Sequence, residues 1–203
     1  MADRSTAADY GWLEEQYPSL MEAYCVTLAR GLTPDALLAA LGVATGERVT
    51  GVRAMEVPAY ERFEDDGHFV GVTAVGDWSL MVEYNGFVGV TDALMLPISR
   101  GREVVSHFRN VNAVDHFCWF EDGTTRLHFE PLFAHQRDGS HPDGILTEME
   151  GAGFDMDETD ECNFERHTEA AFALAERLTG VRLTPEVLAS AEFTCGRVPD
   201  PLG

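Results

Sequence analysis

The stretch Asp115–Glu130 reads DHFCWFEDGTTRLHFE and decides the fold. Two runs rich in aromatic and β-branched residues flank the dipeptide Asp122-Gly123. This dipeptide is typical of a two-residue hairpin turn, which pairs the residues directly before and after it and thereby fixes every pair further out. The stretch therefore predicts two antiparallel strands, Asp115–Glu121 and Thr124–Glu130.

The register of this hairpin predicts which side chains share a face of the sheet. Successive residues of a strand alternate between two faces, so the cross-strand pairs fall into two sets. One set of pairs is mostly apolar and is expected to be buried, and the other set contains most of the polar side chains. The pairs are Cys118 with Leu127 and Phe120 with Thr125 on the buried side, and Trp119 with Arg126, Phe117 with His128 and Asp115 with Glu130 on the other.

The pair of Asp115 and Glu130 gives the hairpin a candidate site. Two carboxylates in opposite positions repel each other unless a proton, an arginine or a metal ion lies between them. His128 lies beside them, and the preceding strand carries His107 and Arg109. These five residues are candidates for a catalytic acid/base site, and Asp115, His128 and Glu130 for a divalent metal site. The alternative is that the strand ends after Glu130 and the acids point into water; no other cofactor is expected.

The patterns around the hairpin predict an α+β protein. Period-two runs predict strands over residues 21–30, 70–75, 78–84, 103–109 and 192–198, and helical spacing predicts helices over 91–96, 143–150 and 163–179. We expect one domain over residues 1–203, with an antiparallel, hairpin-rich sheet of about six strands and helices packed mainly on one face. Within it, residues 1–20 are an N-terminal segment, 131–142 a surface loop and 155–162 an acidic segment.

The charge of the chain argues against several classes of protein. The 35 acidic residues exceed the 14 basic ones and leave a net charge of −21. Such a surface repels phosphate backbones and anionic membranes, so nucleic-acid binding is not expected. All 14 basic residues are arginine, which excludes Schiff-base enzymes, Walker-loop enzymes and kinases that need a lysine. No apolar run suits a bilayer span or a secretory signal, so we expect a cytoplasmic protein.

Three further features have simple structural interpretations. The cysteines are widely separated and form no Cys-x-x-Cys pair, so we interpret them as packing or spare thiols; they are Cys25, Cys118, Cys162 and Cys195. The alternating acids of residues 155–161 resemble the start of a calcium loop, but Asp160 stands where that loop needs glycine. His167 falls on the apolar stripe of the longest helix, which favours a hydrogen-bonded core histidine.

Other side chains are candidates for contact with a partner protein. Trp119 and Arg126 are expected to form a cation–π pair, which either serves the sheet surface or anchors a partner. The loop after the hairpin carries His135, Arg137 and His141 among residues that cannot form the interior of a strand. These three are candidate partner contacts, although loops of this composition also occur without such a role.

The chain resembles an uncharacterised family of actinobacterial proteins that is classed only as a domain of unknown function. The resemblance rests on segments spread over most of the chain, of which His107–Val114 is the most distinctive. It implies a high-GC actinobacterial origin, which would suit the use of arginine in place of lysine. It implies no activity, cofactor or catalytic residue. The segments are YCVTL (24–28), GLTP (31–34), VVSHFRNVNAV (104–114), FEPLF (129–133) and LTGV (178–181).

These observations leave three hypotheses for function. The first is an acidic cytoplasmic module that docks a basic protein, in the manner of immunity proteins that neutralise toxins, because a charge of −21 speeds association with a cationic partner. The second is a metal-assisted hydrolase centred on Asp115, His128 and Glu130. The third attributes the acidity to solubility or to mimicry of nucleic acid. The sequence favours the first, because common catalytic motifs are missing.

Overall fold

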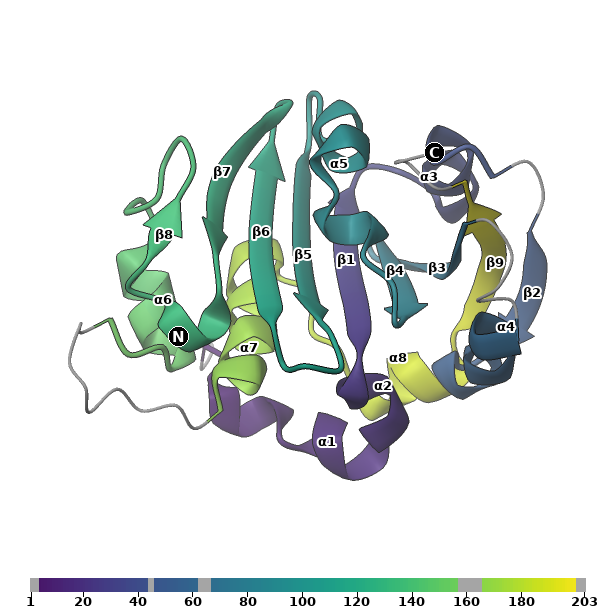
Figure 1. Cartoon of the computed structure of the whole chain (residues 1–203), viewed down its shortest axis with the longest axis horizontal. Helices are drawn as coiled ribbons and strands as arrows, with labels where there is room; N and C mark the ends of the chain where they lie inside the picture. Colours follow the sequence, from purple (N-terminus) through teal and green to yellow (C-terminus); the bar gives the residue numbers. More distant parts are fainter. Residues whose placement is uncertain (1–3, 44–45, 62–66, 157–165, 200–203) are drawn as a thin grey trace.

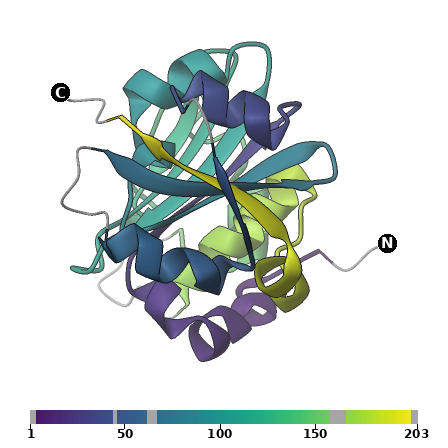
Figure 2. The same ribbon diagram turned by 90° about the vertical axis from the view of Figure 1, so that its right-hand side faces the viewer.

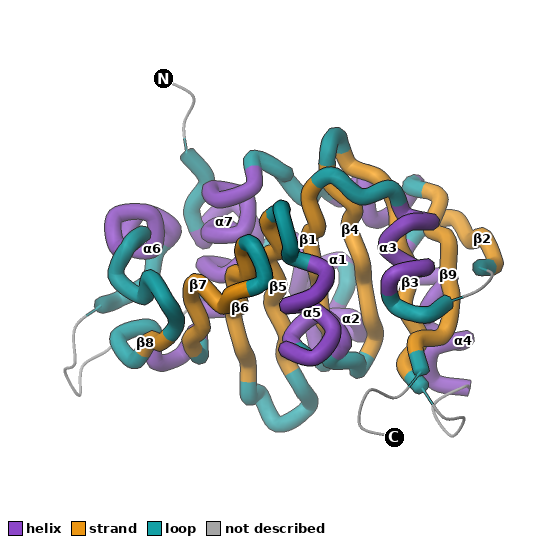
Figure 3. Tube along the Cα trace, turned by 90° about the horizontal axis from the view of Figure 1, so that it is seen from above, coloured by secondary structure: helices purple, strands orange, loops and turns teal. Residues whose placement is uncertain are grey.

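A computed structural model describes residues 4–43, 46–61, 67–156 and 166–199. These residues contain one antiparallel sheet in the order β2-β9-β3-β4-β1-β5-β6-β7-β8, which can be followed from edge to edge in Figures 1 and 3. The strands are β1 (Tyr24–Arg30), β2 (Glu47–Thr50), β3 (His68–Val75), β4 (Trp78–Tyr84), β5 (Glu103–Arg109), β6 (Asp115–Glu121), β7 (Thr124–Phe129), β8 (Arg137–Asp138) and β9 (Glu192–Val198).

Helices cover both faces of this sheet. The α-helices are α1 (Trp12–Gln16), α2 (Pro18–Glu22), α3 (Pro34–Ala40), α4 (Glu56–Glu61), α5 (Asp92–Ile98), α6 (Leu146–Ala152), α7 (His167–Thr179) and α8 (Pro185–Ser190), and the 3₁₀ helices are η1 (Ala7–Tyr10), η2 (Val52–Met55), η3 (Val88–Val90) and η4 (Pro131–Phe133). Figure 2 shows α3 and α5 on one side of the sheet and most other helices on the opposite side. The described helices are too short or too polar to span a bilayer.

A separate hydrophobic core lies on each face of the sheet. On strand β4, Leu80 and Val82 belong to the larger core, which also contains Phe172 of α7. Met81, between them in the sequence, points the other way into the smaller core beneath α3 and α5. Because both faces are covered, the central strands lose the alternation of apolar and polar residues that a half-exposed sheet shows.

The predicted α+β fold with an antiparallel sheet is confirmed, but the sheet has nine strands among the described residues and not about six. The additional strands β2 and β8 have four and two residues and lie at the two edges. Strand β8 falls within the segment 131–142 that we predicted as a loop. The acidic segment 155–162 lies outside the described residues from residue 157 onward, and so does Cys162.

The predicted hairpin turn is confirmed, but the register beyond it is wrong. Asp122 and Gly123 have φ angles of 50° and 75°, and the residues beside them pair as expected. A β-bulge then shifts the register between Trp119 and Phe120, so that Arg126 becomes an extra residue. As a result His128 pairs with Cys118 instead of Phe117, Phe129 takes the place opposite Phe117, and Leu127 takes the place opposite Trp119.

The bulge has a visible cause in the neighbouring loop. The carbonyl oxygen of Arg126 accepts a hydrogen bond of 2.9 Å from the backbone N–H of His141, and that of Thr125 accepts one of the same length from Ser140. The backbone around Arg126 is thus bonded to the loop that follows β8. The predicted opposition of Asp115 and Glu130 therefore does not form, because every pair beyond the bulge is displaced by one residue.

Candidate functional site

The ends of β5 and β6 bring charged side chains together beneath helix α7. Arg109 is the last residue of β5 and pairs with Asp115, the first residue of β6. His107 lies two residues before Arg109, so its side chain points to the same face of the sheet. On that face the His107 ring packs against Phe172 of α7 with its centroid at 5.2 Å. The strand period thus directs these groups toward one helix.

Asp115 is the centre of this cluster and is fully buried. Its Oδ2 atom lies 3.4 Å from Nη1 of Arg109 and 3.5 Å from Nε2 of His167, the first residue of α7. Nε2 of His107 is 3.8 Å away. The Arg109 Nη1 group also donates a hydrogen bond of 3.1 Å to the hydroxyl oxygen of Thr168. A single carboxylate therefore links two strands to the start of α7.

Two buried groups extend the cluster away from solvent. The Tyr24 hydroxyl lies 3.0 Å from Nδ1 of His107. Burial lowers the pKa of His107, and the nearby Asp115 opposes this shift only in part. Burial also raises the pKa of Tyr24 well above its usual value. Both groups are therefore uncharged at neutral pH, and neither forms a hydrogen bond with Asp115.

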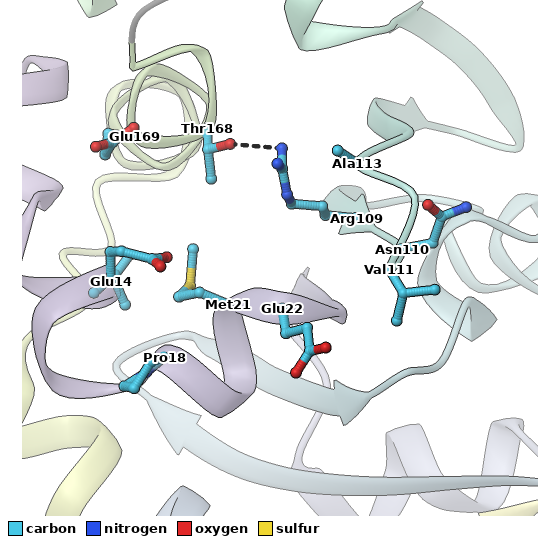
Figure 4. A pocket seen from close by; sticks show the side chains of 11 residues that line it. Glu14, Pro18, Met21, Glu22, Arg109, Asn110, Val111, Ala113, Thr168 and Glu169 are labelled. Atoms are coloured by element: carbon cyan, nitrogen blue, oxygen red, sulfur yellow. Dashed lines mark hydrogen bonds between the residues drawn. The ribbon is translucent and has the colours of Figure 1, made fainter.

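A cleft of about 340 Å³ lies beside the cluster, and Arg109 and Thr168 form part of its wall (Figure 4). Three carboxylates from three helices also line it: Glu14 of α1, Glu22 of α2 and Glu169 of α7. None of the three forms a hydrogen bond or an ion pair with another described residue. The positive charge of Arg109 is balanced by Asp115, so the uncompensated charge of the cleft is negative.

The loop between β5 and β6 forms the opposite wall of the cleft. The Asn110 side-chain oxygen accepts hydrogen bonds of 2.9 Å from Asn112 N–H and 3.1 Å from Val114 N–H. Ala113 adopts a φ of 61°, an unusual value for a residue with a side chain. This loop holds Val111 and Val114 in solvent, where they are 62% and 40% exposed. Two apolar side chains are thus fixed beside an acidic cleft.

The structure brings together four of the five predicted site residues. His107, Arg109 and Asp115 lie close together. Glu130 is near enough to Asp115 that the charge of Asp115, together with burial, raises the pKa of Glu130. His128 does not join them. The bulge turns it to the face of α5, where it lies with His116 in a different pocket.

Sequence reasoning did not identify Tyr24, His167 and Thr168 as members of this cluster. His167 was predicted to be a hydrogen-bonded core histidine, and its Nε2 atom does approach Arg109 and Asp115. The sequence offered no signal for Tyr24, whose partner His107 is 83 positions away. The described residues contain no group of three or more His, Cys, Asp or Glu side chains arranged to hold a metal ion.

The predicted partner contacts lie away from the cleft, toward the β8 edge of the sheet. Arg126 lies over the Trp119 ring at 5.6 Å, as expected, and also approaches Glu121 at 3.2 Å. Arg137 forms an ion pair with Asp143 at 2.8 Å. His135 contacts the ring of Phe133, and His141 is exposed. These side chains therefore do not form one surface with the acidic cleft.

Comparison with known proteins places the chain in a family. No curated protein and no solved structure matches the chain. One family model, described as a family of unknown function (DUF6461), matches residues 3–202 and so covers both the cleft and the buried cluster. The chain therefore belongs to the DUF6461 family.

Proposed function

We propose that this protein is a cytoplasmic binding module that docks a basic protein partner at the acidic cleft, as an immunity protein docks a toxin. The observation that carries the proposal is the convergence of Glu14, Glu22 and Glu169 on one cleft whose only lining cation, among the described residues, is already paired with Asp115. A lysine or arginine side chain of a partner would find three carboxylates there. Charge-assisted hydrogen bonds of this kind are stronger than neutral ones.

The β5–β6 loop supports the same proposal. Interfaces combine a desolvated apolar centre with polar groups around it. Val111 supplies apolar surface in the cleft, Val114 is exposed on the same loop, and the Asn110 side chain holds the loop in one shape. A loop that is ordered before binding loses little conformational entropy when the partner arrives. The net charge of −21 would also accelerate the encounter with a cationic protein.

A labelled nona-arginine peptide tests whether the cleft selects cations. The triple variant Glu14→Gln, Glu22→Gln, Glu169→Gln removes the cleft charge, and we expect it to weaken peptide binding roughly tenfold or more at low salt. The matched control is Asp35→Asn, Asp77→Asn, Glu150→Gln, which removes the same number of charges. In that control the side chains form no hydrogen bond or ion pair with a described residue and line no part of the cleft. The control should change the affinity less than about threefold.

The outcome distinguishes the remaining hypotheses. Equal losses in the two triple variants would contradict the cleft and favour acidity that serves solubility alone. The alternative of a metal-assisted hydrolase is not favoured by the positions of its residues, since His128 lies on the other face of the sheet and Asp115 is buried.

A further inference from the structure

A second cluster of polar side chains lies on the opposite face of the sheet, under α5. His116 of β6, His128 of β7 and Asp138 of β8 follow one another across the sheet. Nε2 of His128 is 3.1 Å from Nδ1 of His116, and the two rings are stacked with centroids 5.2 Å apart. Nδ1 of His128 is 3.4 Å from Oδ2 of Asp138. The three side chains form a connected row.

This row borders a pocket of about 310 Å³ that is separate from the acidic cleft. The pocket is also lined by Asp92 at the start of α5 and by Thr125 of β7. The His128 side chain is 34% exposed and that of Asp138 77% exposed, so small solutes can reach the pair. On its other side the His116 ring stacks on Phe108 with an interplanar angle of 12°, which fixes its orientation.

The carboxylate sets the chemistry of the two rings. In the tautomer with the proton on Nδ1, His128 donates a hydrogen bond to Asp138 and its Nε2 carries a lone pair directed at His116. A histidine that donates one ring N–H to a carboxylate while its other nitrogen faces a ligand position is the usual arrangement at metal sites. Metal–nitrogen bonds of about 2.0–2.1 Å place two ligating nitrogens roughly 3.3–3.4 Å apart when the angle at the metal is near tetrahedral. The 3.1 Å between Nε2 of His128 and Nδ1 of His116 is slightly shorter than this, so an ion needs the two rings to move slightly apart.

We propose that His116 and His128 bind one divalent transition-metal ion, with Asp138 orienting His128 from behind. Two imidazoles favour copper, nickel or zinc over calcium and magnesium, and among these Cu²⁺ should bind most tightly. Among the described residues no third His, Cys, Asp or Glu side chain completes a group that could hold a metal ion, so water fills the remaining positions and the affinity should be about micromolar. This inference does not depend on the proposed docking function, which uses the other face of the sheet.

Isothermal titration calorimetry of the full chain with Cu²⁺ and with Zn²⁺ tests the proposal by measuring the affinity and the number of ions bound. We expect one ion per chain, and a loss of affinity of about tenfold or more in His116→Gln and in His128→Gln. Asp138→Asn should weaken binding by about tenfold without removing a ligand, because it disturbs the tautomer of His128. The matched controls are His135→Gln and His141→Gln, which lie outside the pocket and should bind like the unaltered chain.

Two results would overturn the proposal. One is an unaltered chain that binds neither ion at about 100 µM. The other is an equal loss in the two control variants, which would indicate binding by scattered surface histidines. A thermal unfolding curve of each variant checks that it folds. An ion that binds only the folded state raises the melting temperature, so a His116 or His128 variant that unfolds cooperatively but shows no rise with metal supports the assignment.

Discussion

At the residue scale, Asp115 pairs with Arg109, the arginine that lines the acidic cleft. It is fully buried, and Arg109, His167 and His107 all approach it. Removing one partner of a buried pair leaves the other charge without compensation. Asp115→Ala should therefore lower the free energy of unfolding by about 3 kcal/mol, measured by urea denaturation.

Asp143→Ala is the matched control for this prediction. Asp143 also pairs with an arginine, Arg137, at 2.8 Å, but its side chain is 69% exposed. Exposed ion pairs contribute little, so the control should cost less than about 1 kcal/mol. If both substitutions had the same small effect, Asp115 would not organise the cluster, and the cleft would have to be held by the β5–β6 loop alone.

Glu83 presents a second buried carboxylate, on the face of α5. Its oxygens accept hydrogen bonds of 3.0 Å from Val88 N–H and 3.1 Å from Gly89 N–H. Burial raises its pKa from 4.5 to about 7, and the two backbone bonds oppose the shift only in part. The folded state therefore binds more protons than the unfolded state between these two pH values, so this group's contribution to stability falls as the pH rises through that window.

Glu83→Gln removes this titration. The stability of the variant relative to the unaltered chain should rise between pH 5 and pH 8 by up to about 3 kcal/mol, since each pKa unit corresponds to about 1.4 kcal/mol. Denaturation curves at several pH values measure the difference. A constant difference across this range would show that Glu83 is already ionised at pH 5 in the folded protein.

At the scale of elements, the 3₁₀ helix η3 packs so closely on strand β1 that its residue Gly89 has no room for a side chain. A Cβ atom on Gly89 would lie 1.9 Å from the Thr27 hydroxyl and 2.8 Å from the Cys25 sulfur. Gly89→Ala should therefore lower the free energy of unfolding by about 1–3 kcal/mol. Gly11→Ala is the control, because a Cβ there meets nothing within 4 Å and its φ is −57°. An equally stable Gly89→Ala variant would mean that η3 can move off the sheet.

Much of this element structure could be predicted from sequence, and the exceptions have physical causes. Strands β5, β6 and β9 match their predicted limits, and the two-residue turn at Asp122 forms as expected. Turn chemistry acts within a few residues, so a local pattern reveals it. The bulge at Arg126 depends on hydrogen bonds from a loop that follows β8, and no local pattern carries that information.

The candidate site shows the same division between local and tertiary information. His107, Arg109 and Asp115 were predicted to meet because they lie on paired strands joined by a short loop. Tyr24 and His167 reach the cluster from β1 and α7, which only the tertiary fold brings near. His128 was assigned to the wrong face, because a single extra residue in one strand reverses the side to which all later side chains point.

At the scale of the whole molecule, the net charge of −21 affects the stability of the fold itself. Thirty-five acidic residues on a compact chain repel one another, and 14 arginines offset only part of this repulsion. Added salt shortens the range of the repulsion, from about 30 Å at 0.01 M to about 3 Å at 1 M. The melting temperature should therefore rise when NaCl is raised from about 0.01 M to about 0.5 M at pH 7.

Exposed ion pairs act in the opposite direction, because salt weakens them. Three of them are Arg30–Glu103, Arg48–Glu192 and Arg182–Asp9, and each contributes little in solvent. A melting temperature that falls with salt would mean that such pairs outweigh the general repulsion. KCl in place of NaCl should give the same rise, since screening depends on ionic strength and not on the cation. Repeating the scan on the triple cleft variant should give a smaller rise, because three of the repelling carboxylates are gone.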